Sequence, residues 1–313
     1  MQTDILQNLI RNIETVMIGN ENTIRLVLTA LVANGHVLLE DVPGTGKTVL
    51  ARTLARSISA SFGRVQFTPD MLPSDITGLN YYNSAEEKFI FAPGPVFCNI
   101  LLADEINRAT PKTQSSLLEC MAERQVTTDG VTRRLESPFL VIATSNHLEN
   151  LGTFPLPEAQ MDRFLMRISM EALSPVGEKA LISRFMKDEP LEHLEAVCGI
   201  DELVQLQAAC RDVRISDVLL DYIVRLIHAT REGGKILNGV SPRGTLAFVR
   251  AAQAYALVSG REYVVPEDLK TVAVPVLSHR LSMLASADSS RAAEAAIREL
   301  LDTVDLPTED WTK

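Results

Sequence analysis

The chain has few cysteines, and their spacing lacks the pattern of a metal site or a disulfide framework. Its 313 residues include four cysteines, at positions 98, 120, 198 and 210, and no two of them form a C-x-x-C pair. Structural zinc sites and small disulfide-rich domains need more closely spaced cysteines. The five histidines are scattered as well. We therefore expect a protein of a reduced compartment, held together by its hydrophobic core.

A long apolar run is also lacking. No stretch approaches the ~18 uncharged apolar residues that a transmembrane helix needs. The N-terminus, Met1 to Asp4, has neither the basic residues nor the apolar segment of a secretory signal. We expect no membrane span and a cytoplasmic location.

Positive charge is in deficit. Lysine and arginine number 30 against 40 aspartates and glutamates, which gives a net charge of −10. A protein whose whole surface grips nucleic acid needs the opposite balance, so we expect no such role, although a local basic patch remains open. Hydrophobic residues make up 46% of the chain, ample for a packed core, and the length suggests about two domains.

What the chain does have is a segment, residues 35–48, that predicts a phosphate-binding loop. Its sequence is Gly-His-Val-Leu-Leu-Glu-Asp-Val-Pro-Gly-Thr-Gly-Lys-Thr. An apolar run typical of a buried strand leads into a glycine-containing loop, and apolar residues repeat at helical spacing from Lys47 onward. This is the context of a P-loop. Asp41 stands where the usual motif has its first glycine, and an ordinary helix start is the alternative interpretation.

Each part of this loop can serve a nucleotide. Gly44 and Gly46 let backbone N–H groups turn toward a phosphate, and the helix that follows adds the positive end of its dipole. Lys47 can reach the β- and γ-phosphates, and the Thr48 hydroxyl can bind Mg²⁺. The chain has no Asn-Lys-x-Asp motif for reading guanine, which favours ATP over GTP.

Two later apolar runs end in polar residues suited to the same site. Residues 99–103 predict a buried strand that ends in Asp104 and Glu105, and residues 139–144 predict another that leads to Asn146. Parallel sheets bind ligands at the carboxyl ends of their strands. In P-loop enzymes the first carboxylate holds Mg²⁺ and the second activates water, while an amide such as Asn146 can orient that water. A solvated turn or helix cap is the alternative for the two carboxylates.

Before the first of these strands, residues 68–95 interrupt the alternation of strands and helices. Residues 79–82 and 88–91 predict two strands joined by a polar turn, and the segment is rich in aromatic residues. These aromatics either form the core of a hairpin or contact a partner from an exposed insertion. Because side chains alternate along a strand, we expect at least one of Tyr82 and Phe89 to be exposed. Asp129-Gly130 predicts a second hairpin, at 125–136.

The pattern changes near Pro175. Before it, strands alternate with helices, which predicts a parallel sheet flanked by helices. After it, only helices are evident, and Arg243 lies at the start of one of them. The expected fold is an α/β P-loop NTPase core, residues 1–188, followed by a smaller all-α lid, residues 189–313. Arg163 closes a short predicted helix at 155–164, where an arginine is usually a surface charge or a helix cap.

Seven segments, in this order, resemble the MoxR family of AAA+ ATPases, and the resemblance covers essentially the full length. They are Leu-Leu-Glu-Asp-Val-Pro-Gly-Thr-Gly-Lys-Thr (38–48), Gln-Phe-Thr-Pro-Asp-Met-Leu-Pro-Ser-Asp-Ile-Thr-Gly (66–78), Ala-Pro-Gly-Pro-Val-Phe (92–97), Leu-Leu-Ala-Asp-Glu-Ile-Asn-Arg-Ala (101–109), Ala-Thr-Ser-Asn (143–146), Leu-Pro-Glu-Ala-Gln-Met-Asp-Arg-Phe (156–164) and Ser-Pro-Arg (241–243). The departure at Asp41 recurs in loops of this type. Ser145-Asn146-His147 departs from the more usual Gln-Asn-Pro but keeps the asparagine.

The resemblance implies a role for each candidate site residue. Thr48 and Asp104 would bind Mg²⁺, Glu105 would activate water, and Asn146 would be sensor 1. Arg163 would be the arginine finger that reaches a neighbouring subunit's nucleotide, and Arg243 would be sensor 2, at the nucleotide. Residues 70–92 would form the helix-2 insert. The remaining ATP-binding positions would be Ile18, Gly19, Val42, Pro43, Gly44, Thr45, Gly46 and Lys47.

The resemblance also implies how such a protein works. Its family forms rings, commonly hexamers, that hydrolyse ATP to mature or remodel protein clients, often alongside a protein with a von Willebrand A domain. Two rival functions remain: an AAA+ motor acting on DNA or in metal chelation, and a nucleotide-gated scaffold that barely turns ATP over. The negative charge argues against DNA, and the intact Asp104-Glu105 pair argues against a scaffold.

Overall fold

The fold is built on a five-stranded parallel sheet. The computed structural model describes residues 2–40, 44–145, 152–170, 172–186, 188–232, 234–284 and 289–306. The strand order in the sheet is β2-β5-β8-β1-β9, and every neighbouring pair runs parallel. The strands are β1 (Val37–Glu40), β2 (Phe62–Gln66), β5 (Ile100–Asp104), β8 (Leu140–Ser145) and β9 (Met166–Ser169).

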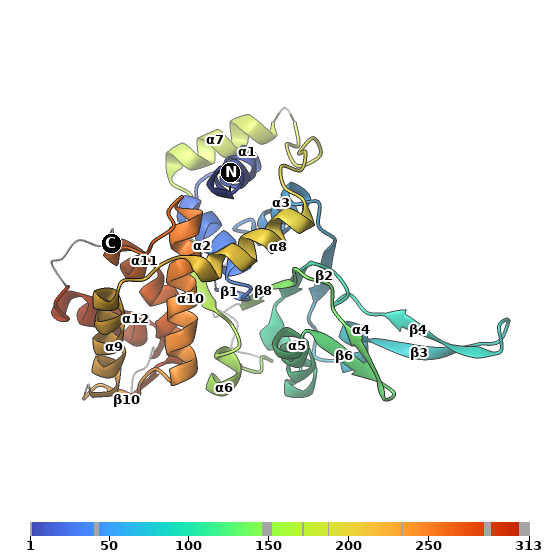
Figure 1. The fold of residues 1–313 in the computed structure, drawn as a ribbon. Helices are drawn as coiled ribbons and strands as arrows, with labels where there is room; N and C mark the ends of the chain where they lie inside the picture. The colour runs from blue at the N-terminus through green and yellow to red at the C-terminus, as the bar shows by residue number, and fades with distance from the viewer. Residues whose placement is uncertain are drawn as a thin grey trace.

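Helices cover both faces of this sheet, as Figure 1 shows. Alternate residues of a strand point to opposite faces, and the two buried clusters follow this rule. Val37 and Leu39 pack with α1 (Gln2–Val16), α2 (Glu21–Val32) and α3 (Lys47–Ser57), whereas Leu38 packs with α5 (Pro111–Glu123). The expected parallel sheet flanked by helices is confirmed.

Because the strands are parallel, their carboxyl ends meet at one edge. Register pairs Glu40 with Ser145, and Ala103 with Ala143. The ends of β1, β5 and β8 therefore lie side by side. This edge carries the loop before α3, the pair Asp104-Glu105 and the end of β8, as the sequence predicts.

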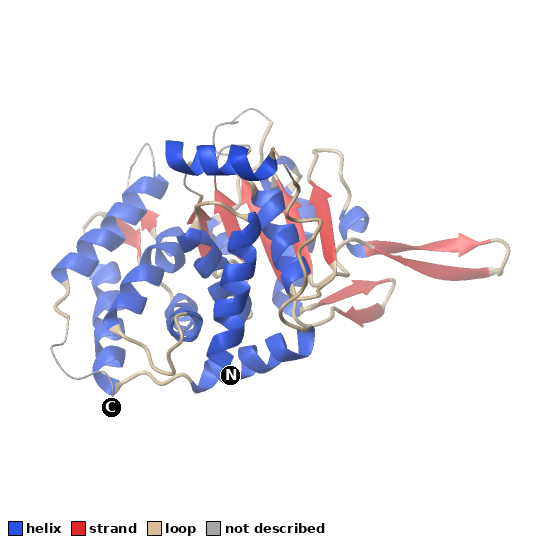
Figure 2. Cartoon of the chain, turned by 90° about the horizontal axis from the view of Figure 1, so that it is seen from above, coloured by secondary structure: helices blue, strands red, loops and turns tan. Residues whose placement is uncertain are grey.

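Two hairpins project from the core. After the short helix α4 (Pro73–Thr77), β3 (Gly78–Asn83) and β4 (Lys88–Pro93) form a hairpin that stands away from the rest of the chain (Figures 1 and 2). The second hairpin is β6 (Gln125–Thr128) with β7 (Val131–Arg134). Its turn residues Asp129 and Gly130 both have positive φ, at 51° and 76°, as the Asp-Gly signal predicts. Both predicted hairpins are confirmed.

The C-terminal part is a helical lid. Its helices are α8 (Ile200–Ala209), α9 (Asp217–Glu232), α10 (Pro242–Val258), α11 (Pro266–Leu277) and α12 (Ser289–Thr303), and α6 (Glu158–Met161) and α7 (Pro175–Phe185) precede them. Ser241 caps α10 by accepting a hydrogen bond from the Gly244 N–H. The lid also contains a short antiparallel pair, β10 (Ile236–Asn238) with β11 (Ser282–Met283), which the sequence does not predict. The division at residue 188 stays a prediction.

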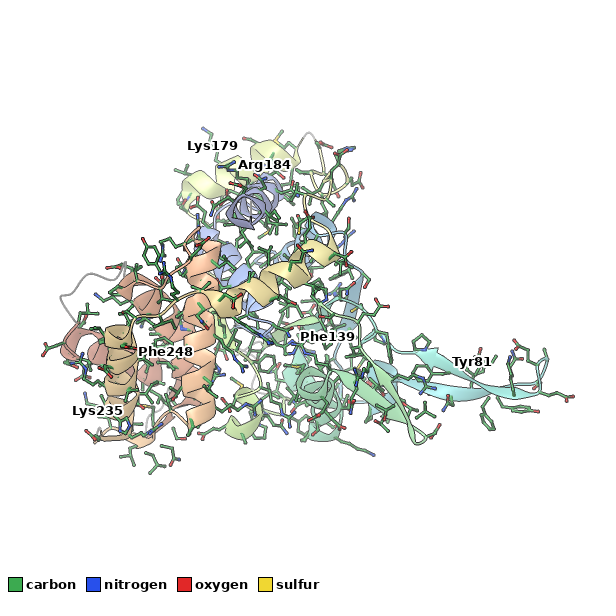
Figure 3. The ribbon with its side chains drawn as sticks, viewed as in Figure 1. Tyr81, Phe139, Lys179, Arg184, Lys235 and Phe248 are labelled. Atoms are coloured by element: carbon green, nitrogen blue, oxygen red, sulfur yellow. The ribbon has the colours of Figure 1, made fainter. Side chains whose placement is uncertain are left out.

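The lid packs along one edge of the core. Helices α10 and α11 contact α2 and the edge strand β9 respectively, and Gln7 of α1 donates to the carbonyl of Val258 at the end of α10. Figure 3 shows Phe248 inside the lid and Phe139 inside the core. Within the described ranges, no helix combines the length and the apolar character that crossing a bilayer requires.

Candidate nucleotide site

A cavity of about 380 Å³ lies at the sheet edge where β1, β5 and β8 end. Gly44 and Gly46 have positive φ values of 92° and 91°, a backbone that glycine adopts at little cost. A Cβ added at Gly44 would meet no heavy atom within 4 Å, so the loop leaves open space for a phosphate. The lining residues are Gly44, Thr45, Gly46, Lys47, Thr48, Val49, Arg64, Asp104, Glu105, Thr144 and Ser145.

The donors in this cavity suit a phosphate and a hard cation. Lys47 and Thr48 form the first turn of α3, whose N-terminal end favours negative charge. The Thr48 hydroxyl and the Asp104 carboxylate are oxygen donors of the kind that Mg²⁺ prefers. The described residues hold no group of three or more His, Cys, Asp or Glu side chains able to bind a metal. A metal here would therefore share its coordination with nucleotide phosphates and water, as Mg²⁺ commonly does.

Thr144 ties the two carboxylates to the sheet. Its hydroxyl donates to Asp104 Oδ1 at 2.7 Å and accepts from the Glu105 N–H at 2.8 Å. Glu105 itself has φ 56° and ψ 50°, a left-handed conformation that is uncommon for a residue other than glycine. Thr144 therefore stabilises the backbone turn at Glu105, where the chain leaves the direction of β5.

Three further residues pair with these carboxylates, and the sequence analysis did not identify them. Arg64 donates to Asp104 Oδ2 at 2.9 Å. Gln66 Nε2 and Arg108 Nε each lie 2.8 Å from Glu105 Oε2. Arg64 and Gln66 lie on β2, which pairs with β5. For Arg64 and Gln66, the only signal in the sequence was that a charged and a polar residue lie two positions apart at the end of a strand.

A second, mostly apolar cavity of about 460 Å³ adjoins the loop. Ile18 and Gly44 to Gly46 line it, so Ile18, one of the two residues expected against the adenine, borders a space of suitable character. Gly19 has φ 67°, and a Cβ there would come within 2.8 Å of Leu173. The sequence does not predict that α7 also lines this cavity. Its lining residues are Glu178, Leu181, Ile182 and Phe185. Arg184 fastens α7 to the carbonyls of Glu14 and Thr15 on α1 (Figure 3).

The two expected arginines lie elsewhere. Arg163 Nη1 donates to the carbonyl of Leu118 at 2.8 Å, and Arg243 Nε lies 3.6 Å from Asp162 Oδ2. Neither lines the cavity of 380 Å³. Arg280 Nε holds the other oxygen of Asp162 at 2.6 Å, and burial lowers the pKa of this guanidinium. The structure therefore places Arg243 beside Asp162, the residue that precedes Arg163, and not at the cavity of the phosphate-binding loop.

Three of the expected site residues cannot be placed. Val42, Pro43 and Asn146 fall outside the described residues. The other expected positions, namely Ile18, Gly19, Gly44 to Thr48, Asp104 and Glu105, all lie at the two adjoining cavities or in the turn beside them.

Comparison with known proteins agrees with this site. Residues 36–166 match the model of the ATPase family associated with various cellular activities (AAA), and residues 228–300 match the AAA lid domain. The chain is 47% identical over 306 residues to the uncharacterized protein YeaC of Bacillus subtilis, covering 97% of this chain and 96% of that protein. A solved candidate ATPase from Cytophaga hutchinsonii superposes with a TM-score of 0.90 at 37% identity, covering 98% and 96% of the two chains.

Two relatives carry the family's own name. The chain is 41% identical over 312 residues to chaperone MoxR1 of Mycobacterium tuberculosis, covering 96% of this chain and 82% of that protein. It is 35% identical over 312 residues to protein MoxR of Paracoccus denitrificans, covering 92% and 91%. Since these matches span both the nucleotide cavities and the lid, the chain belongs to the MoxR family of AAA+ ATPases.

Proposed function

We propose that this ATPase uses Mg²⁺ and acts as a ring, of hexameric type, that remodels a protein client in the cytoplasm together with a von Willebrand A domain partner. The observation that carries the proposal is the separation of Arg163 from the nucleotide cavity. The cavity lies beyond the end of β1, whereas Leu165, two residues after Arg163, donates to the His36 carbonyl at the start of β1. The four residues of β1 span ~13 Å at about 3.3 Å each.

Arg163 can therefore help hydrolysis only at a phosphate that another subunit presents. Arg243 pairs with Asp162, the residue before Arg163, so the two arginines lie close together in the chain fold. We therefore expect both to act at one subunit interface. An arginine that neutralises the charge of the transferred phosphoryl group is a large catalytic contribution in P-loop enzymes. This requirement makes the single chain an incomplete enzyme, which supports an assembly.

The chemistry within one subunit follows from the positions of its side chains. Lys47 would contact the β- and γ-phosphates, and Thr48 and Asp104 would hold Mg²⁺, which when bound would neutralise the developing phosphate charge. Glu105 takes a proton from the attacking water. Its Oε2 accepts hydrogen bonds from Gln66 and Arg108 in this structure, and these two partners orient the carboxylate.

The projecting β3–β4 hairpin supports a protein client. Tyr82 and Phe89 form an edge-to-face pair 5.4 Å apart near its tip, and they are 53% and 73% exposed. The prediction that at least one of them is exposed is confirmed. An isolated two-stranded ribbon is marginally stable in water, and exposed aromatic groups favour a covering partner. Lys88 is paired with Glu86, so the hairpin offers little charge to a nucleic-acid phosphate.

The test of the assembly is sedimentation of the wild type with a non-hydrolysable ATP analogue and Mg²⁺. We expect a monomer-to-ring shift that requires nucleotide, and Phe89→Ala, which lies away from the cavities, should assemble equally well. A monomer at every concentration, with full ATPase activity, would contradict the ring. Affinity capture with Glu105→Gln and ATP tests the client, and ATPase stimulation by DNA but not by captured protein would support the rival motor.

A further inference from the structure

Arg167 of β9 carries a buried guanidinium that is shared between the core and the lid. Its Nε lies 3.5 Å from Glu40 Oε2 at the end of β1, and both side chains are only 8% exposed. Register pairs Arg167 with Leu38, so Arg167 and Glu40 project from the same face of the sheet. On the lid side, its Nη2 lies 3.4 Å from Glu294 Oε1 on α12 and 3.3 Å from Ser278 Oγ. One cation therefore connects the strand before the phosphate-binding loop with two elements of the lid.

None of these three contacts has the length of a tight ion pair. A charge-assisted N–H···O bond is about 2.7–2.9 Å long, whereas the contacts of Arg167 to Glu40, Glu294 and Ser278 are 3.5, 3.4 and 3.3 Å. A cavity of about 310 Å³ borders Glu40, Arg167 and Ser278, so the guanidinium has room to shift. Arg167 therefore has two alternative arrangements, one closer to the core carboxylate and one closer to the lid.

The lid contact of Arg167 leads to the segment that carries Arg163. Ser278 begins η3 (Ser278–Arg280), a short 3₁₀ helix that follows α11. Arg280, at the other end of η3, pairs with Asp162, the residue before Arg163, at 2.6 Å. A shift of Arg167 away from Ser278 would therefore remove a contact from the helix that fixes this segment.

A bound nucleotide would favour one of the two arrangements. Glu40 is the last residue of β1, shortly before Gly44 at the phosphate cavity. ATP remains net negative even with one Mg²⁺ bound, and a cation in a partly buried position is attracted toward such a charge. Arg167 should therefore move toward Glu40, and away from Glu294 and Ser278, when the loop is occupied.

We propose that Arg167 is a positioning residue that couples nucleotide binding at the loop to the placement of Arg163 through η3. This rests on the trans role of Arg163 in the proposed function. With the loop empty, the guanidinium holds Glu294 and Ser278 of the lid. With the loop filled, it turns to Glu40, and η3 and the Arg163 segment can adjust to the neighbouring nucleotide. Each subunit would thereby offer its arginine according to its own nucleotide state.

The first test is calorimetric titration with a non-hydrolysable ATP analogue and Mg²⁺. Glu294→Gln keeps the shape but removes the carboxylate that competes with Glu40 for Arg167, so the dissociation constant should fall by about two- to fivefold, the scale of a partly exposed ion pair. The matched control is Glu299→Gln on the same helix. It removes the same charge from a surface pair with Lys235 and should leave the affinity unchanged.

Hydrogen exchange tests the second step. In the dilute, unassembled wild type, the analogue should speed amide exchange in residues 278–284 and 158–165, because Arg167 then gives up Ser278. In Glu294→Gln this nucleotide-dependent change should be smaller, since the lid contact is already weakened.

An unchanged or raised dissociation constant in Glu294→Gln would overturn the proposal, and so would an equal fall in Glu299→Gln, which would indicate a general charge effect. Exchange in residues 158–165 that does not respond to the nucleotide would contradict the link to Arg163. Both measurements use separate subunits, so failure of the ring itself would be recognised differently, as wild-type ATPase activity that is independent of protein concentration.

Discussion

Arg280 of the lid and Asp162 of the core form an ion pair, with Nε 2.6 Å from Oδ1. Arg280 is only 4% exposed and also donates to the carbonyls of Phe164 and Leu165, so it fixes the segment that carries Arg163. Arg243 approaches the other oxygen of Asp162. One carboxylate thus joins the lid to the segment proposed to serve a neighbouring subunit, and movements of the lid would be transmitted to Arg163.

This pair predicts a stability effect. Asp162→Ala would leave the buried Arg280 guanidinium without its carboxylate, and we expect a loss of about 3 kcal/mol in the free energy of unfolding, as when one partner of a buried pair is removed. Asp188→Ala is the control, because Asp188 pairs with His193 on the surface and should cost at most about 1 kcal/mol. Denaturant unfolding measures both, and equal losses would contradict the role of Asp162.

Nucleotide binding should depend on Lys47. Lys47 lines the cavity from the first turn of α3, so Lys47→Ala should bind ATP more weakly if the cavity holds the phosphates. At a ligand concentration 100 times the dissociation constant, binding stabilises a protein by about 2.7 kcal/mol, which thermal unfolding detects readily. Mg·ATP should stabilise the wild type and the control Lys112→Ala, on the exposed surface of α5, but not Lys47→Ala. Equal stabilisation of all three would reject the phosphate loop.

A substitution at Glu105 should separate ATP binding from ATP hydrolysis. Glu105→Gln removes the base but keeps the shape, so ATP should still bind while hydrolysis slows by at least ~100-fold, the usual scale for a general base. Calorimetric titration with ATP gives the affinity, and phosphate release gives the rate. Normal turnover in this variant would place the base on another residue. Asn146 could not replace it, because an amide is not basic at neutral pH.

The exposed tip of the β3–β4 hairpin predicts a contrast between two phenylalanines. Phe89 is 73% exposed and Phe139 only 2%. Phe89→Ala should lower the free energy of unfolding by about 1 kcal/mol or less, the value of its contact with Tyr82, whereas Phe139→Ala should cost about 3–5 kcal/mol. If the hairpin holds a client, Phe89→Ala should also capture less of it while keeping its ATPase activity. Similar losses of stability would show that Phe89 belongs to the core.

The sequence predicted those parts of the site that are contiguous in the chain. The strand, loop and helix around Lys47 and the pair Asp104-Glu105 were found because their geometry is set by neighbours along the backbone. Arg64 and Gln66 were missed because their role depends on β2 lying next to β5, and an apolar run does not encode its neighbour in a sheet. The place of α7 beside the apolar cavity was missed for the same reason.

The lid shows a second limit of sequence patterns. Its helical character was predicted, because the signals that start a helix, such as the Ser241 cap and Pro242 of α10, act locally. The pair β10–β11 was missed, since three-residue and two-residue strands carry no measurable periodicity. Helix α12 was missed as well, because its buried side is formed mainly by Ala293, Ala296 and Ile297, a weak apolar signal. The position of Arg243 beside Asp162 depends on how the lid packs, which no local pattern specifies.

The position of Arg163 predicts how activity depends on assembly. If its guanidinium serves a neighbouring nucleotide, ATPase activity per subunit should rise with protein concentration until the ring is complete. Arg163→Ala should bind ATP normally but hydrolyse it poorly, since an arginine supplied in trans is worth roughly 10³ or more in turnover. Losing its hydrogen bond to the Leu118 carbonyl should cost about 1.5–3 kcal/mol, less than the total stability of a typical domain, so the variant should fold.

Mixing two inactive variants distinguishes a trans arginine from a local one. Arg163→Ala retains Glu105, and Glu105→Gln retains Arg163, so a mixed ring contains interfaces at which an intact Glu105 faces an intact Arg163. We expect partial recovery of activity on mixing, greatest near equal amounts. A second mixture, Arg163→Ala with the double variant Lys47→Ala, Glu105→Gln, tests whether Lys47 and Glu105 act at the same nucleotide. In that second mixture the ATP-binding subunits still have Glu105 and can still meet an intact Arg163, so recovery should persist. No recovery in either mixture, together with activity independent of concentration, would leave Arg163 as a residue that only stabilises its own subunit.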